Sequence, residues 1–509
     1  MLNFNITEMK KTVFFIIILF LLTACQGYLE KAPDSNLDMQ IDSEDKIAEL
    51  LTGAYPEASY FTFLEVRTDN VGERLNGIHS RLNEAMYYWE DYDQEDLDTP
   101  LNYWNACYAG IAQANQALEL LSKYPKSGRI KALYGEAFLL RAYLHFMLVN
   151  IWAEPYGKSG SATAPGIPYL TKPEKNALVD YKRGTVKEVY ERIESDLKLG
   201  LSLVDDDYYA KPKFHFNKKA AYAFASRFYL MKGEWDLVVS YSDYVLGIDP
   251  KPILRNWRNY KKEFQSNNKY LYIRYVSTEE PANLLLATTE SRIARNIPSE
   301  KYGVTSETAD KIYNQHGIDG CYEHKKMRMQ PHFLFNYNDG HIDDAQYIAK
   351  FDEIALSGYI GIRPKGIYVT NVLFSTTEVM LNRIEAYAML GEYERAIDNL
   401  LVYLAAQYEE RLSCPRTAYM QTSSENYQIY TPFYGMNINQ LALVKIILGF
   451  RRQEFLHEGL RWFDIRRFYI PVKRTSKNKF YMPLEKEDPR KLLQIPAEAI
   501  NRGLEPNPR

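Results

Sequence analysis

The chain has 509 residues and a formal net charge of −3 at pH 7, from 62 basic and 65 acidic side chains. A nucleic-acid partner would require a concentrated positive face, and this sequence carries no basic block, so we exclude that class of partner. The length would allow several domains, but no Gly/Ser-rich or Pro-rich linker divides the chain, which predicts one large body over residues 25–509.

The first 24 residues are predicted to be a signal peptide of the lipoprotein type. Two adjacent lysines precede an apolar run over residues 13–22, and small residues then lead to Cys25. This ending resembles the lipobox of bacterial lipoproteins, which implies cleavage before Cys25 and acylation of its thiol. A transmembrane helix is the alternative, but the run has only about half of the ~20 apolar residues needed to cross a bilayer. Met1 and Met9 both stay open as the start of translation.

Helical patterns occupy the first half of the mature chain. Over residues 104–121 the apolar positions fall on one face of a 3.6-residue period, and a denser apolar pattern follows over residues 130–152. Thr185 and Glu188 have the spacing of a capping box, which predicts the start of a further helix.

Two segments far apart in the sequence look alike. Residues 229–235 (YLMKGEW) correspond to residues 387–393 (YAMLGEY), and in each a glycine separates an alanine-rich helix from an amphipathic one. This is the helix–turn–helix signature of tetratricopeptide repeats. We therefore predict a mostly α fold with a tetratricopeptide-like scaffold, whose helices lie at about 103–152, 185–247 and 378–407.

Residues 250–372 differ from the helical segments in their pattern of apolar and polar residues. Short apolar runs such as residues 270–276 predict strands, and polar loops that contain aromatic, Asn, Asp and Gly residues surround them. Loops held on a rigid scaffold are where binding usually resides. This insertion is therefore the predicted ligand-binding region.

Three cysteines would remain after lipidation of Cys25, namely Cys107, Cys321 and Cys414. Their spacing argues against a structural zinc site, and one disulfide among them stays open because the sequence cannot assign its pairing. Residues 91–95 (DYDQE) alternate acidic side chains as a calcium loop does, but the later positions of the EF-hand pattern do not fit. We predict no cofactor, with calcium at this loop as the weaker alternative.

Glu454 and Glu458 are the carboxylates most worth testing for catalysis. They lie four residues apart on one predicted helix and share a face, whereas a glycosidase needs two carboxylates across a cleft and one raised pKa. Arginines crowd both glutamates in the sequence and would lower their pKa values instead. We predict a structural ion-pair network and no enzymatic activity, with a lipid-anchored glycosidase as the alternative.

Several segments, taken in order, resemble the SusD/RagB family of outer-membrane nutrient-binding lipoproteins. The residues that carry the resemblance are Cys25–Pro33; Trp104, Tyr108, Ile111, Asn115 and Leu118; Gly135–Tyr143, Trp152, Pro155, Tyr156 and Gly157; Gly166–Pro168; Arg452–Arg467; and Ile495, Pro496, Asn507 and Pro508. One departure lies before Glu378, where the family often carries an arginine and this chain has Phe374–Thr377. It predicts a changed ion pair at the second repeat.

The resemblance implies a SusD-like domain over residues 25–509, closed by a C-terminal region at about 443–509. It implies a lipid-anchored protein of the outer membrane that faces the cell exterior and binds oligosaccharide or polysaccharide. Its implied partner is a SusC-like TonB-dependent transporter, to which the glycan is delivered. A peptide ligand, as in the RagB branch, and a periplasm-facing adaptor for protein assembly are the alternatives.

Aromatic side chains are the candidate ligand contacts. A sugar ring packs its C–H groups on an aromatic face, and its hydroxyls need polar side chains beside that face. Tyrosine is abundant, with 42 residues against 23 Phe and 6 Trp, although most such rings are expected to pack between helices. The residues expected to bind the ligand are Trp89, Tyr92, Trp257, Phe335, Tyr337 and Asn338.

Overall fold

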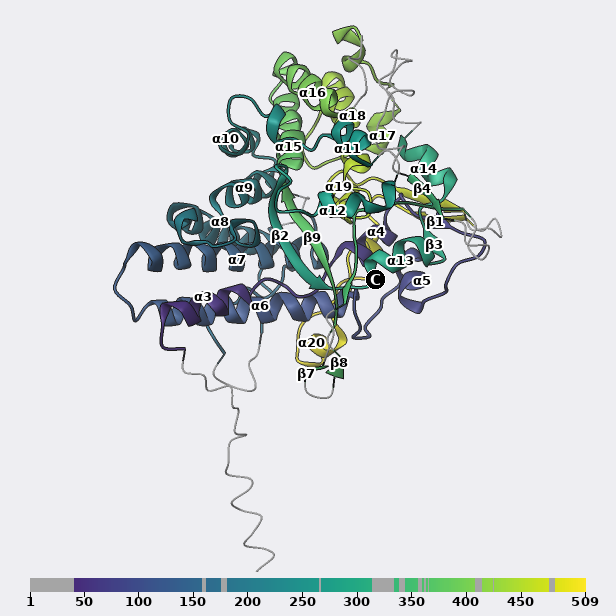
Figure 1. Cartoon of the computed structure of the whole chain (residues 1–509). Helices are drawn as coiled ribbons and strands as arrows, with labels where there is room; N and C mark the ends of the chain where they lie inside the picture. The colour runs from purple at the N-terminus through teal and green to yellow at the C-terminus, as the bar shows by residue number, and fades with distance from the viewer. Residues whose placement is uncertain are drawn as a thin grey trace, which may run out of the picture. The chain divides into compact units, whose positions relative to one another are not determined.

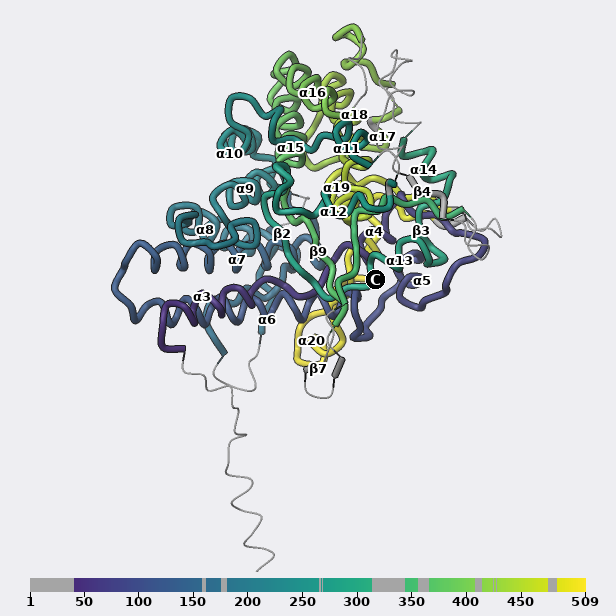
Figure 2. The backbone as a smooth tube through the Cα atoms, in the orientation of Figure 1, coloured from purple at the N-terminus to yellow at the C-terminus, as the bar shows by residue number. Residues whose placement is uncertain are grey.

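The computed structural model describes residues 41–509, except 158–161, 175–180, 265–266, 314–333, 338–343, 356–358, 361–362, 365, 408–413, 424 and 476–480. The predicted signal peptide and Cys25 therefore lie outside the described residues. Residues 47–509 form one compact unit, whose course Figure 2 follows from purple to yellow.

Helices make up most of this unit (Figure 1). The longer ones are α6 (Pro100–Leu121), α7 (Gly128–Trp152), α8 (Val186–Leu203), α9 (Lys218–Lys232), α10 (Trp235–Leu246), α15 (Thr376–Met389), α16 (Tyr393–Gln407) and α18 (Ile438–Glu454). The shorter ones are α3 (Glu44–Thr52), α4 (Phe61–Arg67), α5 (Arg81–Tyr87), α11 (Trp257–Phe264), α12 (Leu271–Tyr275), α13 (Ile293–Ser299), α14 (Ser306–Tyr313), α17 (Asn426–Ile429), α19 (Leu460–Arg467) and α20 (Ala497–Asn501). Single 3₁₀ turns lie at 206–208, 212–214, 251–253, 268–270, 416–420 and 489–491.

Helices that follow one another in the chain also pack on one another. α6 packs on α7, α7 on α8, α9 on α10 and α15 on α16, while α10 also contacts α15. Figure 1 shows these helices stacked from α6 to α16. The prediction of a mostly α fold with a scaffold of paired helices is confirmed.

Local sequence signals set the ends of these helices. The hydroxyl of Thr185 accepts from the N–H of Glu188, and the Glu188 carboxylate accepts from the N–H of Thr185, so the capping box begins α8. Gly233 follows α9 with φ of +73°, and Gly391 has φ of +78° between α15 and α16. Glycine adopts this left-handed conformation without steric cost, which explains why the two similar segments make the same turn.

The helix at the centre of the scaffold is α7. Among the described residues it is the one helix long and apolar enough to cross a membrane, but 89% of its apolar stretch is buried inside the fold. His145 lies in this helix, with Nδ1 2.8 Å from the carbonyl oxygen of Arg141, while Nε2 accepts from the N–H of Leu170 at 3.0 Å. These partners suit the neutral ring, and burial lowers the pKa of His145 to about 3.

Short antiparallel strands lie between and beside the helices. They are β1 (Gly72–Glu73), β2 (Asn283–Glu290), β3 (Tyr302–Gly303), β4 (Leu334–Tyr337), β5 (Ala345–Ile348), β6 (Ile354–Ala355), β7 (Tyr359–Ile360), β8 (Arg363–Pro364), β9 (Ile367–Ser375), β10 (Val472–Thr475) and β11 (Tyr481–Leu484). β9 pairs with β2 on one side and β6 on the other, and the remaining strands form the pairs β1–β3, β4–β5, β7–β8 and β10–β11. The insertion at 250–372 thus contains strands, as expected, but its described residues also form the short helices α11 to α14.

One predicted strand is wrong. Residues 270–276 contain the helix α12, and its two buried side chains, Leu271 and Tyr275, are four residues apart. This spacing places them on one helical face, toward Trp257 and Tyr260 of α11. A short apolar run fits either period, and here packing against α11 selects the helix.

The ion pair at the second repeat is supplied from another helix. The Nε of Arg227 in α9 donates to Oε1 of Glu378 at 2.6 Å, and its guanidinium carbon lies 4.0 Å from the Phe374 ring centroid. Arg227 also donates to the carbonyl oxygen of Leu373 at 2.7 Å. An arginine from the first repeat therefore pairs with Glu378, which starts the second, and joins the two repeats through buried charge.

One of the described cysteines is a free thiol and the other is in a disulfide, two states that the sequence left open. Cys107 is free and buried in α6, and burial raises the pKa of its thiol. Cys414 is disulfide-bonded, whereas Cys321 lies outside the described residues. A disulfide therefore involves Cys414, and Cys107 takes no part in it.

Candidate ligand-binding surface

Trp89 is a core residue, which corrects its prediction as a ligand contact. Its side chain is only 2% exposed, its indole N–H donates to the carbonyl oxygen of Arg67 at 2.9 Å, and the Arg474 guanidinium lies 4.4 Å from its ring centroid. The polar edge of the ring and the face under Arg474 are therefore engaged within the protein. The predicted stacking of a ligand on Trp89 is wrong because the ring is packed in the protein interior next to α5.

Trp257 is also buried, with 0% of its side chain exposed. Its indole N–H donates to Oε2 of Glu454 at 2.9 Å, and its ring packs near Tyr260 and Tyr275. Trp257 begins the amphipathic helix α11 and faces the core. The second tryptophan of the predicted site is therefore a packing residue as well.

The other predicted residues are not part of this buried tryptophan packing as far as the structure describes them. Tyr92 is half-buried and its hydroxyl donates to Oε1 of Gln94 at 3.2 Å. Phe335 and Tyr337 belong to β4, where they are in register with Tyr347 and Ala345 of β5. Asn338 lies outside the described residues.

A tyrosine pair on α5 and β3 forms the centre of a candidate site. The rings of Tyr87 and Tyr302 stack with centroids 4.2 Å apart, and the half-buried Tyr88 meets Tyr302 edge-on at 5.7 Å. The hydroxyl of Tyr302 donates to that of Tyr88 at 3.4 Å, and burial raises the pKa of Tyr302. The Tyr88 ring thus packs against Tyr302, while part of it stays exposed to solvent.

Charged side chains surround this tyrosine pair. Lys301 Nζ lies 3.1 Å from a carboxylate oxygen of Glu73 and 5.4 Å from the Tyr302 ring centroid. Arg81 pairs with Glu84 and with Glu90, each at 3.0 Å. We call this region the α5–β3 surface and define it by Glu73, Arg81, Glu84, Glu90, Tyr88, Lys301 and Tyr302.

Hydrogen bonds from below fix the α5–β3 surface. The Asn83 side chain donates to the carbonyl oxygen of Tyr302 and accepts from its N–H, both at 2.9 Å, which ties α5 to β3. The guanidinium of the buried Arg74 donates to the carbonyl oxygens of Ile297, Pro298, Glu300 and Val304 at 2.8–3.2 Å. Burial lowers the pKa of Arg74 to about 10, so the side chain stays charged at neutral pH.

The insertion reaches the same surface. The N–H of Gln346 in β5 donates to the carbonyl oxygen of Val304 at 2.9 Å, next to β3. This contact attaches the β4–β5 hairpin, which carries Phe335 and Tyr337. The structure therefore brings together three of the predicted segments, the end of α5, Tyr92 and β4, whereas Trp257 packs in the core with Val304 and Ile348.

The acidic loop at 91–95 spreads its carboxylates apart. Asp91 pairs with Arg509 at 2.6 Å, Asp93 accepts from the N–H of Ala497 at 2.9 Å, and Glu95 accepts from the Asn105 amide at 3.1 Å. Each carboxylate thus has its own protein partner. Over the part of the chain that the structure describes, no cluster of three or more potential metal ligands occurs.

Glu454 and Glu458 are enclosed in the core. Both are buried, at 0% and 3% exposed, and Glu458 pairs with Nζ of the fully buried Lys350 at 2.7 Å. Burial raises the pKa of Glu454, although Arg255 lies 3.7 Å away. The expectation of a lowered pKa at Glu454 is wrong because desolvation outweighs the nearby positive charges. The ion-pair network is present, and a substrate cannot lie between these two carboxylates.

Comparisons with known proteins identify the family. Residues 27–230 match a family model described as starch-binding and associating with the outer membrane, and residues 361–497 match the SusD family model. The chain belongs to the SusD/RagB family. SusD-like proteins are carbohydrate-binding proteins associated with the outer membrane.

Individual SusD relatives align with this protein over most of its length. A SusD-like protein of Formosa agariphila is 24% identical over 496 residues, which is 90% of each chain. The crystal structure of a SusD superfamily protein of Bacteroides thetaiotaomicron aligns with a TM-score of 0.67 at 20% identity, covering 92% of this chain and 100% of that one. A laminarin-binding SusD-like protein aligns with a TM-score of 0.59 at 17% identity, covering 91% and 98%. The fold is therefore that of SusD proteins.

Sequence reasoning missed the central member of the α5–β3 surface. Tyr302 stands in a short segment with no repeat, motif or periodic pattern around it. Tyr88 lies in the aromatic run 87–89 that the sequence does highlight, but its neighbour Trp89 looks equally suitable there. Only the positive φ of Trp89, +58°, turns that ring inward while Tyr88 keeps a solvent-facing edge.

Proposed function

We propose that this SusD-like protein is a cell-surface lipoprotein that binds glycans on the α5–β3 surface and delivers them to a TonB-dependent outer-membrane transporter. The observation that carries the proposal is the supported, partly exposed ring of Tyr88, with carboxylates, a guanidinium and an ammonium beside it. Such a surface offers a face for sugar C–H groups and both donors and acceptors for hydroxyls.

The arrangement favours weak binding. One open aromatic ring contributes about 1–3 kcal/mol, a figure taken from base–aromatic stacking, and a flexible glycan loses conformational freedom when it is held. We expect a dissociation constant of roughly micromolar to millimolar. Weak binding suits delivery, because the glycan must leave the protein for the transporter. Purified protein should leave oligosaccharides intact.

A glycan array followed by titration calorimetry tests the site. Tyr88→Ala should weaken binding of the best array hit about tenfold, since it removes the stacking face, and should leave the melting temperature near that of wild type. Tyr244→Ala is the matched control, because Tyr244 is an exposed tyrosine of α10 that stacks on Tyr222 at 4.7 Å, outside the α5–β3 surface. Equal binding by both variants would place the glycan elsewhere.

A peptide ligand is the second candidate, and one feature favours it. Leu75 and Ile78 are 63% and 59% exposed on the segment that follows β1, and this segment runs beside residues 299–301 through backbone hydrogen bonds. Apolar side chains of a peptide could pack there. A peptide panel beside the glycan array separates the two: loss of peptide binding in Leu75→Ser with no glycan bound would favour the peptide.

The anchor is tested separately. Cys25→Ala should move the protein from the membrane fraction to the soluble fraction, because a signal-derived lipid anchor would be its attachment to the membrane. Radiolabelled palmitate should be incorporated by wild type alone. Protease treatment of intact cells then tests the orientation: degradation of the wild-type protein is expected if it faces the exterior.

A further inference from the structure

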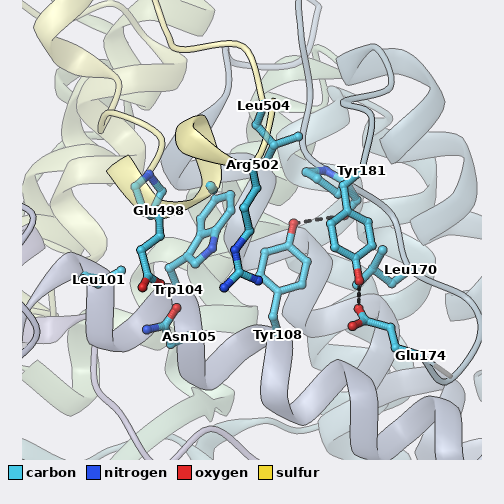
Figure 3. Close-up of a pocket in the computed structure, with 13 residues that line it drawn as sticks. Leu101, Trp104, Asn105, Tyr108, Leu170, Glu174, Tyr181, Glu498, Arg502 and Leu504 are labelled. Carbon is cyan, nitrogen blue, oxygen red and sulfur yellow. Dashed lines mark hydrogen bonds between the residues drawn. The ribbon is translucent and has the colours of Figure 1, made fainter. Parts of the chain in front are cut away.

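A pocket of about 220 Å³ lies between α6 and α20 (Figure 3). We call it the α6–α20 pocket. Its lining comes from α6, from the segment around Pro168 to Glu174, from Tyr181 and from the C-terminal segment. None of these residues belongs to the α5–β3 surface, so the pocket is a separate feature of the molecule.

Two aromatic rings form one wall of the pocket. Trp104 and Tyr108 are four residues apart on α6, and their ring centroids lie 5.0 Å apart. The Tyr108 hydroxyl donates to the carbonyl oxygen of Pro168 at 3.0 Å, and Trp104 packs edge-on against Trp152. Both rings are therefore held in place without a ligand. Tyr108 is half-buried and Trp104 is 6% exposed, and both line the cavity, so Tyr108 offers the larger open face.

The opposite wall carries polar groups that lack protein partners. Glu498 of α20 and Arg502 directly after it are exposed, and within the described residues neither side chain makes a hydrogen bond or an ion pair. Figure 3 shows Arg502 extending toward Trp104 and Tyr108, with Glu498 near Asn105. A free carboxylate, a free guanidinium and an amide thus converge on the space in front of two aromatic rings.

The C-terminal wall is fixed by its own contacts. The N–H of Ala497 donates to Asp93, and the N–H of Leu504 donates to the carbonyl oxygen of Ala499. Asn507 donates to the carbonyl oxygen of Trp152 at 2.7 Å, which ties the end of the chain to α7. A preformed wall lowers the entropic cost of binding, so the geometry suits a small ligand.

Size and charge narrow the ligand class. Drug-sized ligands occupy pockets of about 300–1,000 Å³, so the α6–α20 pocket has room for little more than one sugar ring. Its charged lining is Glu174, Glu498 and Arg502, which sums to a negative charge and disfavours uronates or sulfated sugars. Glu174 already accepts from the Tyr181 hydroxyl, which leaves Glu498 and Arg502 for the ligand.

We propose that the α6–α20 pocket is a second carbohydrate subsite that takes one neutral pyranose ring. The sugar packs on Trp104 and Tyr108, while Glu498 accepts and Arg502 donates hydrogen bonds to its hydroxyls. The choice of a sugar rests on the proposed function, but the pocket uses none of the residues of the α5–β3 surface. A short glycan can therefore bind in the pocket when Tyr88 is absent.

The experiment is ligand-observed saturation-transfer NMR on the mature chain with methyl β-glucoside, methyl β-galactoside, methyl α-mannoside and glucuronate. At least one neutral methyl glycoside should give a signal, and glucuronate should give none.

Ala499→Phe places a ring in the pocket and should abolish the signal. Ala497→Phe makes the same change on the same helix outside the lining and should keep it. The double variant Glu498→Ala/Arg502→Ala, at two exposed positions, should reduce affinity about tenfold and keeps the test valid if Ala499→Phe misfolds.

The outcomes separate this inference from the proposed function. An oligosaccharide that binds wild type and loses affinity in Tyr88→Ala, with no signal from any methyl glycoside, overturns the pocket and keeps the α5–β3 surface. A methyl glycoside signal that survives in Ala499→Phe also overturns the pocket. A signal from glucuronate with none from the neutral methyl glycosides would mean that Arg502 selects an anion, and would overturn the ligand class.

Discussion

The helical scaffold and the loop-rich insertion differ in how far they rely on packing between neighbours in the chain. In the scaffold, such helices pack on one another, as α6 does on α7 and α15 on α16, and the buried ion pair Arg227–Glu378 joins the two repeats. In the insertion, buried charged side chains reach across long stretches of sequence: Lys350 binds Glu458, 108 residues away, and Arg74 binds the turn at 297–304. The insertion, which carries β3 of the candidate α5–β3 surface, is therefore held in place partly by buried ions.

The strongest test of this difference is to remove one such ion. Lys350→Met leaves the Glu458 carboxylate buried without its ammonium partner, and breaking a buried pair in this way costs about 3–5 kcal/mol. Lys187→Met is the control in the scaffold, because its pair with Glu191 is exposed at 3.9 Å and such pairs contribute about 0–1 kcal/mol. Urea unfolding of both variants gives the comparison. Similar losses would mean that this buried pair of the insertion contributes no more to stability than an exposed pair of the scaffold.

The second test uses the buried tryptophan below the α5–β3 surface. Trp89→Ala should lower the free energy of unfolding by about 3 kcal/mol or more, because it leaves a cavity beside Arg474 and frees the carbonyl oxygen of Arg67. Tyr88→Ala, one residue earlier, should change stability far less, since that ring is half-buried. A stable Trp89→Ala protein with reduced glycan affinity would return Trp89 to the ligand site.

The same difference explains what the sequence can and cannot predict. Scaffold helices are specified locally: the capping box at Thr185 and the glycine turns at Gly233 and Gly391 act within a few residues of themselves. The candidate site is specified by distant contacts. Tyr302 becomes a site residue only because Asn83 binds its backbone from 219 residues away, and no local pattern encodes such a contact.

Two buried groups, His145 of the scaffold and Glu300 of the insertion, should contribute to stability with opposite pH dependence. His145 in the scaffold has its pKa lowered by burial to about 3, so its contribution is complete above pH 6.5 and is lost as the pH falls toward 3. Glu300 in the insertion has its pKa raised by burial to about 7, so its contribution is complete below pH 4.5 and is lost as the pH rises through 7. Between pH 6.5 and 5, His145 should account for a loss of about 2 kcal/mol.

Unfolding of two variants across pH 5–8 separates the contributions. His145→Gln should remove the loss of stability on the acid side, and Glu300→Gln should remove the loss on the basic side. Each variant serves as the control for the other, because each substitutes a neutral side chain at a buried titrating position. Identical pH profiles of stability for both variants would contradict the opposite pH dependence assigned to His145 and Glu300.

The smallest expected effect concerns the two matching turns of the scaffold. Gly391 has φ of +78°, and a Cβ added there would meet nothing within 4 Å. The cost of Gly391→Ala is then the backbone penalty alone, about 1–2 kcal/mol. Gly233 has nearly the same φ, but an added Cβ would lie 3.3 Å from Phe433 and from Tyr434, so Gly233→Ala should cost more.

Gly435→Ala is the control, since that glycine has open space and no left-handed φ, and the change should be neutral or stabilise by about 0.4–1 kcal/mol. Thermal unfolding that ranked Gly435, Gly391 and Gly233 in any other order would show that the two turns are not set by local backbone conformation.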